Sequence, residues 1–176
     1  MTPADAETSG TGGGLRYLTE EACPDVVAQE QSHSCQVACA RQLLIDAGVT
    51  MTETELAERI GVVEGWGSTA NSTALGLTEL HPELDYNGGV VMEQFHSVLF
   101  RRDPWIATLR TDGGRFHAVI VDKLDGDIVF LRDPWGPLGL GSDCGSKATI
   151  RLSEFMAHWD AANNHAAFPF RRKQRS

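Results

Sequence analysis

The two halves of this chain carry different secondary-structure patterns, and the order of these halves restricts the fold. Before Pro104, apolar residues recur at helical spacing in segments bounded by capping residues and glycines. After Pro104, short apolar or alternating runs are separated by turn sequences such as Asp112-Gly-Gly114 and Asp125-Gly126. Helices followed by strands that pair through tight turns indicate an α+β protein with an antiparallel sheet rather than a doubly wound parallel sheet.

The predicted elements follow from caps, periodicity and turns. The first helix covers 34–47, with Ser34 as its N-cap and Gly48 after its end. The sequence Thr52-Glu-Thr-Glu55 resembles a capping box and predicts a second helix through Ile60. We expect further helices at 72–80 and 92–100, and a short one capped by Ser153. The predicted strands are 105–109, 116–123, 127–131, 148–152 and 166–170, and Asp125-Gly126 predicts a hairpin between the second and third.

Composition limits both the domain organisation and the partners. Residues 1–14 are rich in Gly, Ser and Thr and predict a disordered arm, residues 15–170 one domain, and residues 171–176 a basic tail. The net charge of −9 argues against nucleic-acid binding. No apolar run is long enough for a membrane span, and the first twenty residues lack a secretory-signal pattern. We therefore expect a cytoplasmic protein, or one delivered without a classical signal peptide, whose four cysteines are free thiols.

Four residues carry candidate chemistry. Cys35 stands in the first turn of the first predicted helix, where the helix dipole favours a thiolate. Gln29, six residues earlier, offers a side-chain amide that can stabilise an oxyanion. His117 begins a predicted strand and can accept the thiol proton. Asp133 follows the hairpin and can orient the imidazole. Together these residues predict nucleophilic catalysis by a thiolate.

These residues also resemble a known family in their order and spacing. Gln29 and Cys35 are separated by five residues, and Cys35-Gln-Val-Ala-Cys39-Ala resembles the nucleophile helix of papain-like cysteine peptidases. The similarity is greatest to the bacterial double-glycine (bacteriocin-leader) peptidase branch. The segments His117-Ala-Val-Ile-Val-Asp and Leu131-Arg-Asp-Pro-Trp-Gly136 resemble that branch's histidine strand and aspartate turn. Ser34 and Gln36 depart from it, because the family usually has an acidic residue or Asn before the cysteine and Gly after it.

The resemblance implies a fold and an activity. The helical half would pack on the antiparallel sheet with the active-site cleft between them. Cys35 would act as nucleophile, His117 as general base and acid, Asp133 as orienting residue and Gln29 as oxyanion donor. The reaction would be hydrolysis of a peptide or protein substrate without a metal or organic cofactor. Bulky walls at Trp66 and Trp135 would favour cleavage after Gly or Ala. The Gly12-Gly13-Gly14 run would either be a linker or allow self-cleavage after Gly13 or Gly14.

Several alternatives accompany this interpretation. Cys39 could be the nucleophile, but the residue six positions before it is His33 rather than an amide, and a core thiol fits its place better. His33, Cys35, Cys39 and His117 have the ligand types of a zinc site. The same triad could deamidate or transamidate a glutamine side chain in an effector toxin, with an immunity or carrier protein as partner. Lastly, the domain could bind peptides without turnover.

Overall fold

The computed structural model describes residues 14–62, 68–137, 139 and 141–171. The predicted arm therefore lies outside the described residues except for Gly14, and the predicted tail except for Arg171. Along the chain the described elements are β1 (Thr19–Ala22), α2 (Cys35–Asp46), α3 (Glu53–Ile60), α4 (Ala70–Leu80), β2 (Leu84–Val90), the 3₁₀ turn η1 (Glu93–Phe95), α5 (His96–Leu99), β3 (Trp105–Arg110), β4 (Phe116–Asp125), β5 (Ile128–Asp133), β6 (Ser146–Arg151), α6 (Leu152–Ala161) and β7 (His165–Arg171).

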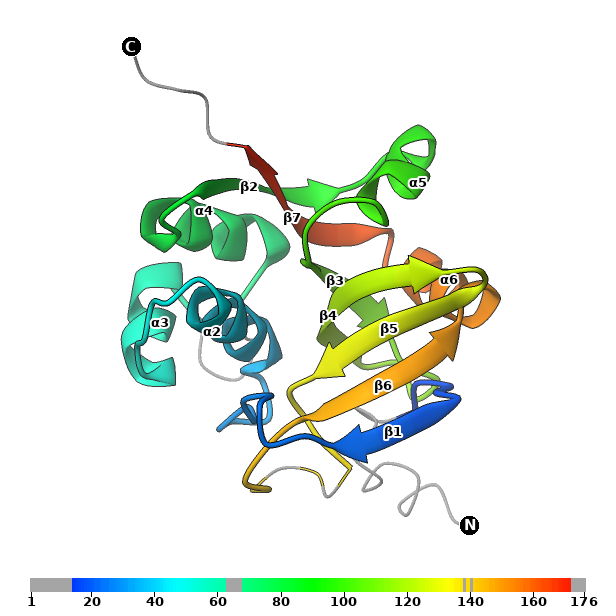
Figure 1. The fold of residues 1–176 in the computed structure, drawn as a ribbon, viewed down its shortest axis with the longest axis horizontal. Helices are drawn as coiled ribbons and strands as arrows, with labels where there is room; N and C mark the ends of the chain where they lie inside the picture. Colours follow the sequence, from blue (N-terminus) through cyan, green and yellow to red (C-terminus); the bar gives the residue numbers. More distant parts are fainter. Residues whose placement is uncertain (1–13, 63–67, 138, 140, 172–176) are drawn as a thin grey trace.

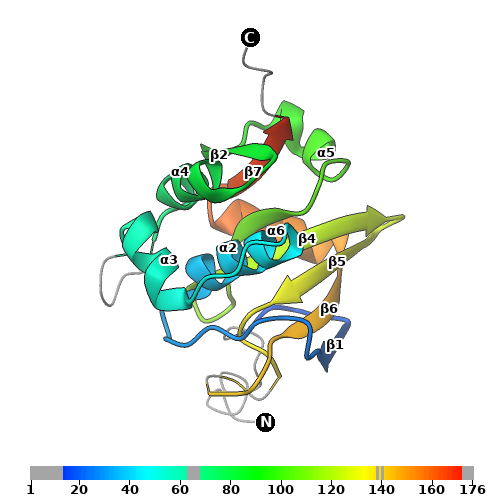
Figure 2. The ribbon, with the colours of Figure 1, turned by 60° about the vertical axis from the view of Figure 1, so that its left-hand side comes forward.

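The described strands form one antiparallel sheet in the order β1-β6-β5-β4-β3-β7-β2. Helices α2, α3 and α4 lie together beside this sheet, whereas α6 lies behind strands β3 to β6 (Figure 1). Figure 2 shows the same arrangement with the molecule turned by 60°, and in this view the strands of the sheet are strongly twisted. The α+β fold with an antiparallel sheet is confirmed.

Strands β3 and β4 separate two hydrophobic clusters. Side chains alternate between the faces of a strand, so Ile106 and Ile120 pack with helices α2 to α4, while Trp105 and Val119 pack with α6. The α6 side is dominated by aromatic contacts, including Trp105 against Trp159 at a centroid separation of 5.3 Å. Both faces of these central strands are thus buried, which explains their nearly unbroken apolar sequences.

The local sequence signals were right at some helix ends and wrong at others. Thr52 caps α3 through its side chain, which accepts a hydrogen bond from the Glu55 amide, and Gly48 follows α2 with a φ of 84°. Ser34 holds the N-cap position of α2 without a side-chain capping bond, because its hydroxyl bonds the backbone of Gln31 instead. Ser153 does not cap α6; it lies inside that helix, since β6 runs directly into the helix through Arg151.

Other boundaries shifted by a few residues. Helix α4 begins at Ala70 rather than at Ser72, behind a capping box formed by Thr69 and Ser72. The helix expected at 92–100 is divided into η1 and α5. The predicted hairpin is confirmed, with Asp125 paired to Ile128 and Gly126 in the left-handed region. Within the described ranges, no helix combines the length and apolar character needed to cross a bilayer.

Candidate active site

Cys35 is the first residue of α2, so its side chain lies at the positive end of the helix dipole. Cys35 is half-buried, and its sulfur is hydrogen-bonded to the His117 side chain and to the backbone amides of Gln36 and Ala118. Contacts to a donor ring and two N–H groups are the environment that stabilises a thiolate. The surroundings of Cys35 therefore favour the thiolate form.

His117 and Asp133 are brought together by the β4–β5 pairing. His117 is the second residue of β4 and Asp133 the last of β5, and the register Ile120 to Arg132 sets these antiparallel ends side by side. Both side chains are buried, and Nε2 of His117 lies 2.7 Å from Oδ1 of Asp133. Because Nε2 is bound to the carboxylate, Nδ1 is the ring nitrogen left for Cys35.

The pKa values of Cys35 and His117 shift in opposite directions. Burial opposes ionisation of the Cys35 thiol, but the His117 ring and the two backbone amides outweigh it and lower the thiol pKa. Burial likewise opposes a charge on His117, yet the Asp133 carboxylate and the Cys35 sulfur raise its pKa to about 10. A lowered thiol pKa beside a raised imidazole pKa favours a thiolate–imidazolium pair at neutral pH.

The Asp133 carboxylate accepts hydrogen bonds from two further donors, which were not among the residues predicted from the sequence. The Trp135 amide donates to Oδ1 at 2.9 Å, and the Tyr17 hydroxyl donates to Oδ2 at 2.6 Å. The amide bond is typical of an Asp that begins a turn, so Asp133-Pro134 was a usable signal for it. Tyr17 lies 116 residues away in sequence, and no local motif connects it with Asp133.

Glu20 adds a second carboxyl group to this region. It lies on β1 and accepts a hydrogen bond from Ser146, which pairs with Asp133 across β5 and β6. Burial and the negative charge of Asp133 raise the pKa of Glu20 to about 7, against the opposing effects of Ser146 and His117. The carboxyl is thus close enough to Asp133 and His117 for its charge to be felt there.

Gln29, the predicted oxyanion donor, is buried in the loop before α2. Its Nε2 donates to the carbonyls of Gln31 at 2.8 Å and Ser32 at 3.4 Å, and its Oε1 has no partner among the described residues. Its backbone amide is tied to the Pro134 carbonyl at 2.8 Å, which links this loop to the turn after Asp133. Both contacts of Nε2 are thus made within the loop, and the one to Ser32 is long enough to be weak.

Cys39 lies one turn further along α2 in a different environment. It is buried in the cluster between α2 and the sheet, and burial together with the Cys35 and Asp133 charges raises its pKa well above the ordinary value. Such a thiol stays protonated and packs as an apolar group. In the described part of the chain, no three His, Cys, Asp or Glu side chains are arranged to hold a metal ion.

A cavity of about 470 Å³ lies beside the loop that carries Gln29. It is lined by Pro24, by residues 26–30, by Arg41 of α2 and by residues 141–143. Of the two tryptophans expected as walls of the substrate site, Trp135 is half-buried in the turn after Asp133, whereas Trp66 lies outside the described residues. The Gly14–Leu15 bond is packed rather than free, because Leu15 is buried and the Gly14 carbonyl accepts the Asp112 amide.

Three solved structures share this fold. A Bacillus anthracis protein described as a C39-like peptidase has a TM-score of 0.60 at 16% identity, over 89% of this chain and 100% of that one. The peptidase domain of Streptococcus ComA, a bifunctional ABC transporter involved in quorum sensing, has a TM-score of 0.58 at 16% identity, over 83% of this chain and 97% of that one. A double-glycine-motif protease from an AMS/PCAT transporter, in complex with a leader peptide, has a TM-score of 0.58 at 15% identity, over 90% of this chain and 97% of that one.

The likeness to known proteins is one of fold rather than of sequence. No protein-family model matches the sequence, and no curated protein is significantly similar to it. The three solved structures show that the chain has the fold of the double-glycine peptidase domains, so the predicted papain-like fold is confirmed.

Proposed function

We propose that this chain is a cysteine peptidase in which Cys35 is the nucleophile, His117 the general base and acid, and Asp133 the group that orients the imidazole. The observation that carries the proposal is the hydrogen-bonded series from the Cys35 sulfur through His117 to the buried Asp133 carboxylate. The likeness to solved peptidase domains supports it independently. The series supplies an activated sulfur, a proton carrier and a fixed ring orientation.

The first half of the reaction forms an acyl-enzyme. The Cys35 thiolate attacks the carbonyl carbon of the scissile amide, and the carbonyl oxygen becomes an oxyanion. The His117 imidazolium then donates its Nδ1 proton to the leaving nitrogen. The C–N bond breaks, the amine departs and the acyl group remains on Cys35 as a thioester.

The second half releases the acyl group. Neutral His117 takes a proton from water, and the resulting hydroxide attacks the thioester carbonyl carbon. The C–S bond breaks, a carboxylic acid leaves and the sulfur departs as a thiolate beside the protonated ring. Asp133 stays ionised throughout and keeps Nε2–H directed toward itself, which leaves Nδ1 aimed at the reacting atoms.

Gln29 is proposed as a donor to the oxyanion. Its Nε2 already holds the loop through the Gln31 carbonyl, and the long contact to Ser32 can be exchanged for one to the substrate. A preorganised amide of this kind stabilises the charge that develops only in the transition state.

Peptides with small residues before the cut are the proposed substrates. Trp135 lies two residues after Asp133 and is half-buried, and its ring is proposed to restrict the space next to the scissile bond. The neighbours include a double-glycine-motif protease solved with a leader peptide, which supports a peptide substrate. We propose cleavage after Gly or Ala.

A peptide library analysed by mass spectrometry tests both the reaction and the preference. Products should end in Gly or Ala, and the Cys35→Ala protein, with a small side chain in place of the thiol, should fold normally and give none. Cleavage after bulky residues would remove the small-residue preference. A mass gain of about 1 Da without chain cleavage would instead assign the triad to glutamine deamidation, and binding without any product would indicate a peptide-binding module.

A further inference from the structure

One oxygen of the Asp133 carboxylate depends on the segment that precedes β1. Oδ2 accepts its hydrogen bond from the Tyr17 hydroxyl at 2.6 Å. The nearby hydroxyl of Ser146 is not available to it, because its proton is donated to Glu20 at 2.7 Å. Within the described ranges Tyr17 is the only donor to Oδ2, and Asp133 is completely buried, so water cannot replace it.

The Tyr17 hydroxyl keeps its proton over the working pH range. Burial, followed by the negative charge and hydrogen bond of Asp133, raises the Tyr17 pKa well above its ordinary value. A phenol that remains protonated is a permanent donor, and a neutral donor to a buried carboxylate makes a strong, short hydrogen bond. The contact therefore holds the carboxylate in one orientation.

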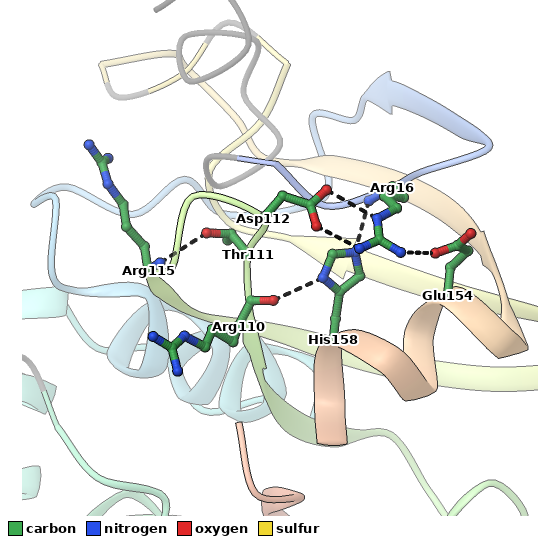
Figure 3. Close-up of polar contacts among 7 residues, drawn as sticks. All are labelled: Arg16, Arg110, Thr111, Asp112, Arg115, Glu154 and His158. Carbon is green, nitrogen blue, oxygen red and sulfur yellow. Dashed lines mark hydrogen bonds and ion pairs between the residues drawn. The ribbon is translucent and has the colours of Figure 1, made fainter. Parts of the chain in front are cut away.

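Arg16, the residue before Tyr17, holds the segment that precedes β1 through ion pairs of its exposed side chain (Figure 3). Its guanidinium donates to both carboxylate oxygens of Asp112, at 2.7 and 3.1 Å, and is also paired with Glu154. Asp112 lies in the turn after β3, whereas Glu154 lies on α6. A single exposed ion pair adds little stability, but a bidentate pair shared between two elements fixes the geometry.

The backbone of the same segment is held as well. The Arg16 amide donates to Nε2 of His158 at 3.2 Å, and the His158 ring is hydrogen-bonded through Nδ1 to the Arg110 carbonyl at 2.9 Å (Figure 3). Leu15 is buried in the aromatic cluster on the α6 side of the sheet, and the Gly14 carbonyl accepts the Asp112 amide at 3.0 Å. Side-chain and backbone contacts thus converge on one position for Tyr17.

From these contacts we infer that Tyr17 is a positioning residue for Asp133, and that Arg16 holds Tyr17 in place for this purpose. The inference rests on the proposed function for the reaction that Asp133 assists. On this inference Tyr17 acts without contact to the substrate, since its hydroxyl is bound to Asp133. It acts through Asp133 on the orientation of His117, and through His117 on the Cys35 thiolate.

The central experiment measures the pH dependence of Cys35 alkylation by iodoacetamide, which needs no substrate. Tyr17→Phe keeps the ring and removes the hydroxyl, so Oδ2 loses its donor and the carboxylate its fixed orientation. We expect the midpoint of Cys35 reactivity to move upward by about half a pH unit to one unit, because the thiolate–imidazolium pair is less well supported. The matched control is Tyr86→Phe, which alters the only other tyrosine, buried among α2 to α4.

The direction of the shift decides the inference. An unchanged midpoint in Tyr17→Phe would overturn it. A downward shift would also overturn it, because it would mean that the hydroxyl merely draws charge away from Asp133 and weakens its bond to His117. An upward shift supports positioning even if no peptide is cleaved, so this result is independent of whether the proposed hydrolysis is correct. Thermal unfolding of both variants checks that the fold is kept; Tyr17→Phe should unfold at the lower temperature, because a buried carboxylate oxygen has lost its donor.

Turnover and a second variant extend the test. With a peptide from the library, Tyr17→Phe should lower kcat about tenfold and leave KM unchanged, since the substrate is not contacted. Arg16→Ala should produce part of the same kcat loss when Tyr17 is present and no additional loss in the Tyr17→Phe background. Additive losses in the double variant would show that Arg16 acts separately, and would overturn its assigned role.

Discussion

Cys35 and Cys39 lie one turn apart on α2, yet their thiol pKa values shift in opposite directions. The first sulfur receives hydrogen bonds from His117 and two backbone amides at the helix start. The second is buried among apolar side chains, near the negative charges of Cys35 and Asp133. A displacement of one turn therefore separates a reactive thiolate from an inert core thiol.

This contrast predicts selective alkylation. At pH 7, Cys35 should react with iodoacetamide at least about tenfold faster than Cys39, since only the thiolate is nucleophilic and Cys39 is buried, whereas Cys35 is half-buried. Peptide mapping of the partly labelled protein measures the ratio. Initial labelling of Cys39 or Cys144 would contradict the assignment of Cys35.

Asp133→Asn should lower kcat by about 100-fold while the domain stays folded. The amide oxygen of Asn can accept from His117 and from the Trp135 amide, and the Tyr17 hydroxyl can turn to accept from the new NH₂. The geometry is thus largely kept, but the imidazolium loses its negative partner. The basic limb of the pH profile of kcat should move below the pKa of about 10 that His117 has beside the carboxylate. A limb that does not move would contradict this electrostatic role.

Gln29→Ala should lower kcat by about 10²- to 10³-fold with a small change in KM, as expected for loss of an oxyanion donor. Gln31→Ala is the matched control, because that side chain is exposed and only its backbone carbonyl contacts Gln29. Steady-state kinetics on one peptide compare the two. Full activity in Gln29→Ala would mean that another donor binds the oxyanion.

The raised pKa of Glu20 predicts a pH-dependent stability. In the unfolded chain this carboxyl titrates near its ordinary value of 4.5, and in the folded protein near 7. Between these values the folded state holds a proton that the unfolded state has released, so Glu20 makes stability fall as pH rises toward 7. Glu20→Gln, which can still accept from Ser146, should raise the free energy of unfolding at pH 8 by about 1 kcal/mol, a figure reduced for partial exposure.

Urea unfolding at pH 5 and pH 8 measures this difference. The exposed neighbour Glu21, changed to Gln in the same way, should leave the pH dependence of stability intact. Equal behaviour of the two variants would contradict the burial of the Glu20 charge as the cause.

The sequence alone predicted the parts of the fold that local signals determine. The Thr52 cap, Gly48 after α2 and the β4–β5 hairpin each depend on residues within a few positions of one another. The structure also brings together three of the residues chosen for catalysis, Cys35, His117 and Asp133, whose types and order carried the prediction. Their catalytic roles remain predictions.

The missed elements depend on distant partners. Strand β1 has no apolar alternation and is defined by its pairing with β6. Strand β2 contains Gly88, where a side chain would collide with the Ala70 backbone, so this glycine reflects close packing against α4 rather than a turn. Tyr17 was missed for the same reason, since its contact with Asp133 spans 116 residues.

The pairing of β1 with β6 also has a consequence during synthesis of the chain. Thr19 and Thr149, joined across these strands, are 130 residues apart. A ribosome that adds 5–20 residues per second needs roughly 6 to 26 seconds to cover that distance. Helix α2 with Cys35 is therefore made long before β4 and β5, which carry His117 and Asp133. We expect the nascent chain to carry Cys35 without its proposed base for the shorter time needed to make the residues up to His117. The proposed activity would begin only after nearly the whole domain has left the ribosome.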